Sequence, residues 1–192
     1  PNRTRIDRNL MKTIILDRDG VINIDSALYI KSPAEWKPIE GSLEAIARLN
    51  QAGYRVIVAT NQSGIGRGLF DMDTLNAMHE KMHKHLAAVG GRIDAIFYCP
   101  HTADEKCDCR KPKPGMFERI AQVYNMDLKD VPTVGDSLRD LQAGSAAGCT
   151  PMLVRTGKGA KTEAEGNLPK GTTVYGNLAA AVDALLGSAG NK

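Results

Sequence analysis

Two aspartates, Asp17 and Asp19, stand at the end of the first short apolar run of the sequence, residues 13–17. Because residues two apart in an extended chain point the same way, both carboxylates are expected to face one crevice. Carboxylates this close repel each other, and a hard divalent cation that prefers oxygen ligands relieves the repulsion. A bare Asp-x-Asp pair is also typical of a solvated acidic turn, but the apolar run before it and Gly20 after it favour a metal-dependent site.

Polar side chains also follow the second apolar run, residues 54–60, in the order Thr60, Asn61, Gln62, Ser63. Glycines at positions 64, 66 and 68 leave backbone N–H groups exposed beside them. A hydroxyl, two amides and free N–H groups together make a nest for a phosphate. Taken alone, the segment favours a flexible turn before the helix that is expected to start near Asp71.

Two further segments supply cations and one more acid. Arg110 and Lys111 precede two prolines that hold the backbone extended, so both side chains could be presented to phosphate oxygens. Cations in a loop are more often simply solvated. Asp136 follows the apolar run 131–135 and is a candidate metal ligand, whereas Asp140 is expected to orient loop backbone or to favour the start of a helix.

Three of the four cysteines lie with a histidine in one short segment: Cys99, His101, Cys107 and Cys109. Two close pairs of soft ligands match a tetrahedral Zn²⁺ site. Because four protein ligands leave no open coordination position, this zinc is expected to be structural and to fold the loop that carries Arg110 and Lys111. The alternative is three free thiols and a surface histidine; Cys149 is expected to be a buried apolar residue.

Short apolar runs alternate with longer amphipathic stretches along almost the whole chain after residue 12. The apolar runs predict strands, listed here by residue number: 13–17, 54–60, 93–99, 131–135, 150–154 and 172–175. The amphipathic stretches predict helices, also listed by number: 42–52, 71–89, 114–124, 138–147 and 177–186. Ser42 and Asp71 are expected to cap helices, and glycines 53, 90 and 148 to end them. The alternation predicts a doubly wound α/β domain, a parallel sheet with helices on both faces.

Three connections are longer than this alternation requires: 20–41, 98–113 and 155–171. Long loops inside a compact domain are usually functional or mobile. In open parallel sheets, ligands bind in a crevice at the carboxyl ends of the strands. The polar residues just after each predicted strand are therefore the candidates for a ligand-binding site.

In this order and at these strand ends, the motifs resemble the four motifs of the haloacid dehalogenase (HAD) superfamily. The Asp-x-Asp-Gly signature is residues 17–20, the hydroxyl after the second strand is Thr60, the lysine is Lys111, and the Gly-Asp acid is Asp136. The resemblance spans residues 13–154. It implies a Rossmann-like, HAD-like fold, and no inserted domain separates the motifs, so no large cap domain is expected.

The resemblance also implies a phosphatase reaction with a role for each motif. Asp17 would attack phosphorus and become an aspartyl phosphate. Asp19 would protonate the leaving alcohol and then take a proton from the water that hydrolyses the intermediate. Mg²⁺ would be held by the Asp17 carboxylate, the Asp19 carbonyl and Asp136. Thr60 and Lys111 would help to neutralise charge on the transferring phosphoryl group.

The zinc loop narrows the resemblance to the branch of the heptose 1,7-bisphosphate 7-phosphatases and the histidinol-phosphate phosphatases. The chain looks more like the heptose enzymes of ADP-heptose and lipopolysaccharide synthesis, which implies a sugar bisphosphate as substrate; histidinol phosphate is the alternative. The substrate-contact segments of the heptose enzymes correspond to Asp25, Ser26, Ala27, Leu28, Thr60, Asn61, Gln62, Ser63, Arg110 and Lys111. Many heptose enzymes have lysine where this chain has Ser137, which leaves the role of that position open.

Two other classes of protein share some of these features. A receiver-type signalling domain also combines Asp, Thr and Lys in a doubly wound sheet, but its acidic pair and its phosphate acceptor lie on different strands. A zinc-binding interaction module would not need the three aspartates at positions 17, 19 and 136. Turnover of an aryl phosphate with magnesium would distinguish the enzyme from both.

A few remaining residues are expected to be structural. His79, His83 and His85 fall on one predicted helix, and without a nearby third ligand the spacing of the first two favours a solvated helix face over a metal site. Trp36, the only tryptophan, is expected to anchor the first long loop.

The composition is that of a globular domain: of 192 residues, 42% are hydrophobic and 24% are charged. No apolar run is long enough to cross a bilayer and no secretory signal is recognised, so a cytoplasmic location is expected. The net charge of +3 resides in residues 1–13, so neither a nucleic acid nor a membrane is expected as a partner. We expect a monomer with a flexible extension at 1–12, a phosphatase domain at 13–187 and a tail at 188–192.

Overall fold

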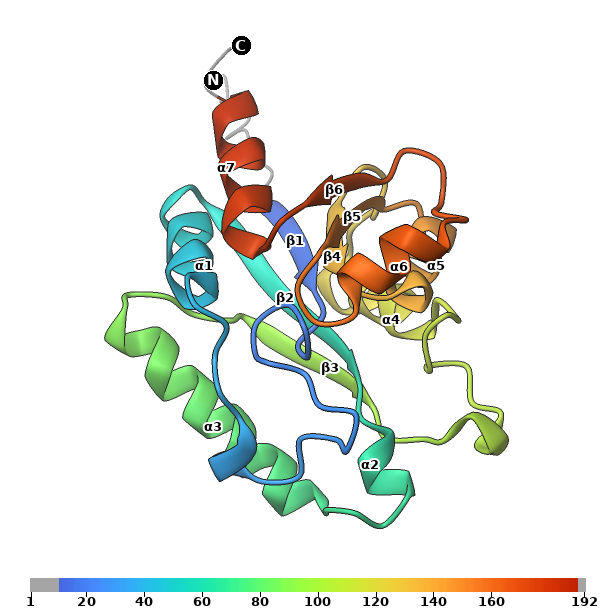
Figure 1. The fold of residues 1–192 in the computed structure, drawn as a ribbon. Helices are drawn as coiled ribbons and strands as arrows, with labels where there is room; N and C mark the ends of the chain where they lie inside the picture. Colours follow the sequence, from blue (N-terminus) through green and yellow to red (C-terminus); the bar gives the residue numbers. More distant parts are fainter. Residues whose placement is uncertain (1–10, 190–192) are drawn as a thin grey trace, which may run out of the picture.

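Six parallel strands form one sheet in the computed structural model, which describes residues 11–189 (Figure 1). The strands are β1 (Lys12–Leu16), β2 (Tyr54–Asn61), β3 (Ala95–Cys99), β4 (Pro132–Gly135), β5 (Thr150–Val154) and β6 (Thr173–Tyr175). Their order across the sheet is β3-β2-β1-β4-β5-β6. The predicted doubly wound α/β fold is therefore confirmed, and all six predicted strands are present.

The predicted helices are also present, together with shorter ones that the sequence pattern did not indicate. The longer helices are α1 (Ser42–Gln51), α3 (Met72–Ala88), α4 (Gly115–Tyr124), α5 (Leu138–Ala146) and α7 (Leu178–Ala189). The additional helices are η1 (Pro33–Glu35), α2 (Ser63–Gly66), η2 (Ala103–Glu105) and α6 (Gly159–Glu165). These are at most seven residues long and lie within the predicted long loops or turns, because segments this short and polar carry no amphipathic period.

The core lies on both faces of the sheet because the central strands are buried on both sides. In β1, Ile14 and Leu16 point to the face that packs against α1, α3 and α7. Ile15 points to the opposite face, where α4 and α5 contribute the apolar partners. Figure 1 shows these two groups of helices on opposite sides of the strands. The continuous apolar run of β1 is thus explained by its position in the middle of the sheet.

Local capping follows the predictions with one correction. Asp71 caps α3, since its Oδ1 accepts a hydrogen bond from the Thr74 N–H at 2.9 Å. Ser42 does not cap α1 as predicted: it is the first helical residue, and Gly41, with φ of 83°, is the cap. The Ser42 hydroxyl instead donates to the Val21 carbonyl at 2.8 Å, which ties α1 to the loop after β1.

The first long loop is anchored by Trp36, as predicted. Its side chain is fully buried, and Lys81 of α3 donates hydrogen bonds to the carbonyls of Pro33 and Trp36, both at 2.8 Å. The loop between β1 and α1 is therefore fixed against α3 rather than free.

The ends of the chain extend the predicted domain slightly. Strand β1 already begins at Lys12, and α7 continues to Ala189. The rest of the predicted extension and tail, residues 1–10 and 190–192, lies outside the described residues. Between residues 11 and 189, no helix is both long and apolar enough to cross a membrane.

The topology decides where a ligand can bind. The chain builds β2 and β3 on one side of β1 and then returns to build β4, β5 and β6 on the other. The connections therefore leave in opposite directions from the carboxyl ends of β1 and β4, and this divergence opens a crevice between them. Asp17 and Asp136 directly follow these two strands.

Candidate active site

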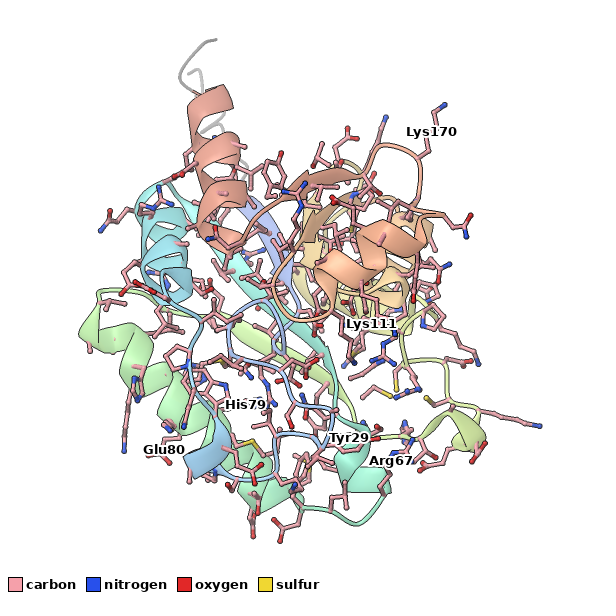
Figure 2. The ribbon with its side chains drawn as sticks, in the orientation of Figure 1. Tyr29, Arg67, His79, Glu80, Lys111 and Lys170 are labelled. Carbon is pink, nitrogen blue, oxygen red and sulfur yellow. The ribbon has the colours of Figure 1, made fainter. Side chains whose placement is uncertain are left out.

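A cavity of about 290 Å³ lies at the carboxyl ends of β1, β2 and β4. Most of the predicted site residues line it: Asp17, Asp19, Asp25, Ser26, Ala27, Asn61, Gln62, Ser63, Arg110, Lys111 and Asp136. Residues that are far apart in the sequence are thus brought together by the parallel strands, as predicted. Figure 2 shows Lys111 at this end of the sheet.

Asp17 lies beside the buried ammonium of Lys111. The Lys111 Nζ is 3.1 Å from Asp17 Oδ1, and the backbone N–H of Arg18 donates to the same oxygen at 2.8 Å. Burial and the neighbouring Asp140 carboxylate nevertheless raise the pKa of Asp17 to about 7. Lys111 therefore offsets only part of the effect of burial and of the neighbouring carboxylates on Asp17.

Asp140 is a functional candidate that the sequence analysis placed only in a structural role. It does cap α5, accepting hydrogen bonds from the Ser137 N–H and hydroxyl, but its Oδ1 also lies 2.8 Å from Lys111 Nζ. Burial alone would raise the pKa of Asp140, but Lys111 and Ser137 hold it at about 2. Asp140 thus fixes the Lys111 ammonium next to Asp17, and Ser137, whose role the sequence left open, helps to hold Asp140.

Asp136 approaches Asp17 because two glycines leave room for it. A Cβ atom at Gly20 or at Gly157, both of which have positive φ, would overlap the Asp136 carboxylate. Burial, together with the charges of Asp140 and Asp17, raises the pKa of Asp136 to about 8. Two buried carboxylates this close favour a cation between them, because a cation offsets both the cost of burial and their mutual repulsion.

The three carboxylates fit a hard divalent cation. One oxygen each of Asp17, Asp136 and Asp140 lies within 4.8 Å of the others. Both oxygens of Asp140 are engaged, Oδ1 by Lys111 and Oδ2 by Ser137. Within residues 11–189, the contacts of Asp17 and Asp136 each involve one oxygen, so each has a second carboxylate oxygen available to a metal. All-oxygen ligands at a site with excess negative charge are what Mg²⁺ prefers.

The Asp19 carboxylate is held by its neighbours on several sides. Its Oδ1 accepts from Arg18 Nε and Asn23 Nδ2, both at 2.9 Å, while Oδ2 accepts from Gln62 Nε2 at 3.2 Å. Burial would raise the pKa of Asp19, but Arg18 and the hydrogen bonds keep it below its usual value. Its side chain does not join the carboxylate cluster of Asp17 and Asp136.

The segment after β2 contributes to the cavity in two ways. Gln62 and Ser63 line it directly, whereas Thr60 is buried behind them and does not line it. The Gln62 amide connects Thr60 to the acid pair, since its Nε2 lies 2.9 Å from Thr60 Oγ1 as well as 3.2 Å from Asp19 Oδ2.

Asn61 lines the cavity, but its amide is already engaged by the backbone of Lys111. Its Nδ2 donates to the Lys111 carbonyl at 3.2 Å, and its Oδ1 accepts from the Lys111 N–H at 3.1 Å. The Lys111 side chain is fixed in turn by donation to the Ala59 carbonyl at 2.8 Å. Asn61 therefore positions Lys111, a role that the sequence analysis did not assign to it.

The predicted zinc ligands converge on one point. The four ligand atoms of Cys99, His101, Cys107 and Cys109 lie within 4.8 Å of one another. The His101 Nδ1 is 3.6 Å from Cys99 Sγ and 3.3 Å from Cys109 Sγ, and the Cys99 and Cys107 sulfurs are 3.6 Å apart. Tetrahedral ligands at zinc distances are on the order of 3.5 Å apart. Three sulfurs and one imidazole nitrogen fit Zn²⁺.

The zinc loop is connected directly to the cavity. Arg110 follows Cys109, lines the cavity and donates to the His101 carbonyl at 3.4 Å. Lys111 is the next residue, and the peptide bond between it and Pro112 is cis. The loop therefore positions two cations of the site, as the sequence analysis expected.

The residues that line the rest of the cavity differ in part from those that the sequence predicted. Of the segment 25–28, Leu28 does not line the cavity and is 73% exposed. Three cations that the sequence analysis did not single out do line it: Arg67, Arg139 and Lys158. Arg67 stacks over the ring of Tyr29 at 5.6 Å, and Figure 2 shows the two side by side at the rim. Scattered single cations have no sequence signature, so only the fold identifies them.

Two of the residues expected to be structural had different outcomes. Cys149 is buried, as predicted. His79 does not lie on a solvated helix face: it is 8% exposed, while His83 and His85 of the same helix are exposed. The cause is Arg18, which follows Asp17 and reaches under the loop to place its Nη1 3.2 Å from His79 Nε2.

Comparison with known sequences agrees with this site. A family model described as HAD-hydrolase-like matches residues 108–181. The chain is 61% identical over 176 residues to the D-glycero-beta-D-manno-heptose-1,7-bisphosphate 7-phosphatase of Bordetella bronchiseptica, covering 92% of this chain and 98% of the relative. It is 54% identical over 173 residues to the enzyme of the same name from Pseudomonas aeruginosa, covering 90% and 97%.

Solved structures show the same similarity. The D,D-heptose 1,7-bisphosphate phosphatase of B. bronchiseptica, complexed with magnesium and phosphate, superposes with a TM-score of 0.92 at 61% identity, covering 93% of this chain and 99% of that one. The corresponding phosphatase of Burkholderia thailandensis gives a TM-score of 0.74 at 58% identity, covering 91% and 98%.

Proposed function

Because the chain belongs to the HAD-like hydrolases and, within them, to the D-glycero-beta-D-manno-heptose-1,7-bisphosphate 7-phosphatases, we propose that it removes the 7-phosphate of that sugar bisphosphate. The 1-phosphate stays in place, and the products are heptose 1-phosphate and inorganic phosphate. The shared name of relatives at 54–61% identity favours this substrate over histidinol phosphate.

One observation carries the proposal: Asp17, Lys111 and Asp136 meet at the carboxyl ends of the strands, in one cavity with further cations. Asp17 supplies a carboxylate that attacks phosphorus, and the P–O bond to the sugar breaks as the aspartyl phosphate forms. Lys111 lies 3.1 Å from this carboxylate and neutralises charge on the transferring oxygens. Thr60 is proposed to help in the same way, although here its hydroxyl lies behind the cavity and contacts the Gln62 amide.

Asp19 is the proposed general acid of the first step and the general base of the second. It gives a proton to the oxygen of the leaving sugar in the first step and takes one from water in the second, in which the phosphate leaves Asp17. The Asp17 and Asp136 carboxylates, with the Asp19 carbonyl, would hold Mg²⁺, which when bound adds positive charge at the phosphoryl group. The magnesium and phosphate in the B. bronchiseptica structure support this choice of metal.

The cations of the cavity suit a substrate with two phosphates. Lys111 is committed to the acid cluster, but Arg110 is not, and its guanidinium lines the cavity. Arginine binds phosphate through paired N–H groups, so Arg110 is the proposed partner of the distal 1-phosphate. Ser26, Ala27 and Ser63 line the same cavity and are proposed to contact the sugar.

Phosphorus NMR tests the proposal directly. With Mg²⁺, the purified protein should convert heptose 1,7-bisphosphate to inorganic phosphate and heptose 1-phosphate, so that the signal of the 7-ester disappears and that of the anomeric phosphate remains. Histidinol phosphate, which carries cationic groups and no second phosphate, should be a poor substrate. Release of the 1-phosphate, or a higher kcat/KM for histidinol phosphate, would contradict the assignment.

We expect Arg110→Ala to affect the two phosphates of the substrate unequally. The kcat/KM for the bisphosphate should fall by roughly 10- to 100-fold, which corresponds to about 1.5–3 kcal/mol for hydrogen bonds to a charged group. The kcat/KM for heptose 7-phosphate, which lacks the distal phosphate, should change much less. Steady-state kinetics with both substrates measure this, and the exposed Arg92→Ala is the matched control. Equal losses with both substrates would remove Arg110 from the distal site.

Zinc is proposed to be structural. Elemental analysis should find about one zinc per chain, because one closed site with four protein ligands holds one ion. Cys107→Ser should lose this zinc, lower the melting temperature and reduce activity, since the loop then no longer holds Arg110 and Lys111 in place. Cys149→Ala, a cysteine outside the cluster, should retain its zinc. A zinc-free protein with full stability and activity would show the assignment to be wrong.

A further inference from the structure

The two oxygens of the Asp19 carboxylate have different surroundings. Oδ1 accepts hydrogen bonds from Arg18 Nε and Asn23 Nδ2, and Arg18 Nη2 lies 2.8 Å from it as an ion pair. Within residues 11–189, the hydrogen bond to Oδ2 comes from Gln62, at 3.2 Å. An oxygen surrounded by donors is a poor place for a proton, so Oδ2 is the oxygen that can carry one.

Arg18 is the main source of this difference, and it is completely buried. A guanidinium is planar, so its orientation is fixed once a second edge is bound. That second edge is Nη1, which lies 3.2 Å from Nε2 of His79 on α3. Figure 2 shows His79 between α3 and the loop that follows β1.

His79 is an acceptor in this contact. Arginine has only N–H donors, so the His79 Nε2 must be unprotonated and its proton must sit on Nδ1. Burial and the charge of Arg18 lower the pKa of His79 to about 3, which keeps the ring neutral. His79 is thus a buried, neutral histidine that accepts a hydrogen bond from Arg18, the residue between Asp17 and Asp19.

We propose that His79 is a positioning residue for the general acid: it fixes the guanidinium of Arg18, which occupies Oδ1 of Asp19 and so leaves Oδ2 to transfer the proton. This inference rests on the proposed phosphatase function. In the first step the Oδ2–H bond of Asp19 breaks and the proton goes to the sugar oxygen, while the P–O bond to the sugar breaks and the bond from Asp17 to phosphorus forms. In the second step water gives its proton back to Oδ2 as its oxygen bonds to phosphorus and the Asp17–phosphorus bond breaks.

The leaving group distinguishes this role from general structural support. A sugar alkoxide must be protonated as it leaves, whereas p-nitrophenolate leaves as a stable anion. Because kcat/KM reports the steps up to phosphoenzyme formation, misplacing Asp19 should lower kcat/KM for the sugar phosphate and spare that for p-nitrophenyl phosphate. Loss of folded protein or of phosphate binding would lower both values together.

The experiment compares His79→Leu with His79→Gln in the full-length protein loaded with its metals. Leucine removes the acceptor, whereas the Gln side-chain oxygen can take the place of Nε2. For His79→Leu we expect kcat/KM for heptose 1,7-bisphosphate to fall at least tenfold. General acid–base catalysis as a whole contributes a rate factor of about 10²–10⁴, and misplacing the acid should lose part of it. The value for p-nitrophenyl phosphate should stay within about twofold of the wild type, as the reaction needs little acid catalysis. His79→Gln should recover most of the loss, and His83→Leu, an exposed histidine on the same helix, should show none.

A second variant covers the case in which His79→Leu does not fold. Arg18→Lys keeps the charge but cannot bind Asp19 and His79 together, so it should show the same selective loss with the sugar substrate. Equal losses with both substrates in the folded variants, or unchanged kinetics in His79→Leu, would overturn the inference. Failure of the wild-type protein to hydrolyse the bisphosphate would overturn the proposed function itself, and the inference with it.

Discussion

Asp17→Asn should abolish turnover of every phosphate ester that the wild-type protein hydrolyses. An amide oxygen is a far weaker nucleophile than a carboxylate. Of the two neighbouring carboxylates, Asp136 is the proposed metal ligand and Asp140 is engaged by Lys111 and Ser137, so neither is expected to replace Asp17. The substitution keeps size and polarity, and it removes one buried negative charge from a crowded cluster. The melting temperature in the absence of metal should therefore be unchanged or higher. The reason is that burial and the Asp140 charge already raise the pKa of the Asp17 carboxyl to about 7, so its negative charge is unfavourable there.

Rapid-quench and steady-state assays measure this outcome. Asp17→Asn should form no phosphoenzyme, whereas Asp19→Asn should form it from p-nitrophenyl phosphate and hydrolyse it slowly, since the base for the second step is missing. Asp73→Asn, an exposed acid at the start of α3, is the matched control and should match the wild type. Appreciable steady-state activity in purified Asp17→Asn, with deamidation excluded by mass spectrometry, would rule out the mechanism.

Lys111→Met should give the next largest loss, about 2–4 kcal/mol of transition-state stabilisation, or roughly 30- to 900-fold in kcat. The Lys111 ammonium is 2% exposed and lies 3.1 Å from Asp17 Oδ1 and 2.8 Å from Asp140 Oδ1. Without it the phosphoryl oxygens lose a cation, and Asp17 and Asp140 face each other with less opposing charge. The pKa of Asp17 should then rise further, so a smaller fraction of the nucleophile is ionised at neutral pH.

The pH dependence of kcat provides the second measurement for Lys111→Met. The acidic limb of the profile should move to higher pH than in the wild type, in addition to the fall in the maximum. Lys113→Met removes a nearby lysine that instead contacts the Cys107 carbonyl at 2.9 Å, so its kcat profile should keep the wild-type shape. A profile for Lys111→Met that is lowered without any shift would mean that Lys111 acts on the phosphoryl group alone.

The motifs that carry the chemistry could be identified from sequence because they are local. Asp17 and Asp19 are adjacent to a strand, and the four zinc ligands fall within residues 99–109, so the relevant distances are set by a few bonds. The alternation of apolar runs and amphipathic stretches predicted the parallel sheet, and a parallel sheet places all strand ends on one edge. The strand ends therefore marked Asp17 and Asp136 as candidates in advance, and the resemblance to the HAD motifs added Lys111 to the same site.

The errors concern side chains whose role depends on a distant partner. His79 was expected on a solvated helix face because no third metal ligand stood near it and His83 in the sequence, but the buried Arg18 lies opposite it. Asp140 was expected only to cap α5, and the proximity of Lys111, which comes from another connection, gives it a second role. Asn61 lines the cavity, and the sequence did not indicate that its amide also binds the Lys111 backbone.

By itself, then, the sequence determined the fold class and the order of the strands' polar ends, and it singled out the two clusters of candidate metal ligands, since these depend on periodicity or on residues next to strands and in one loop. The tertiary structure alone decided which donors surround each carboxylate oxygen, which cations besides Arg110 and Lys111 reach the cavity, and which charges remain unbalanced. These properties depend on distances between segments that are far apart in the chain, and electrostatic energy and hydrogen bonding change steeply over such distances. No local pattern of residues encodes these properties, because the burial and the electrostatic surroundings of a side chain depend on which residues the fold packs against it.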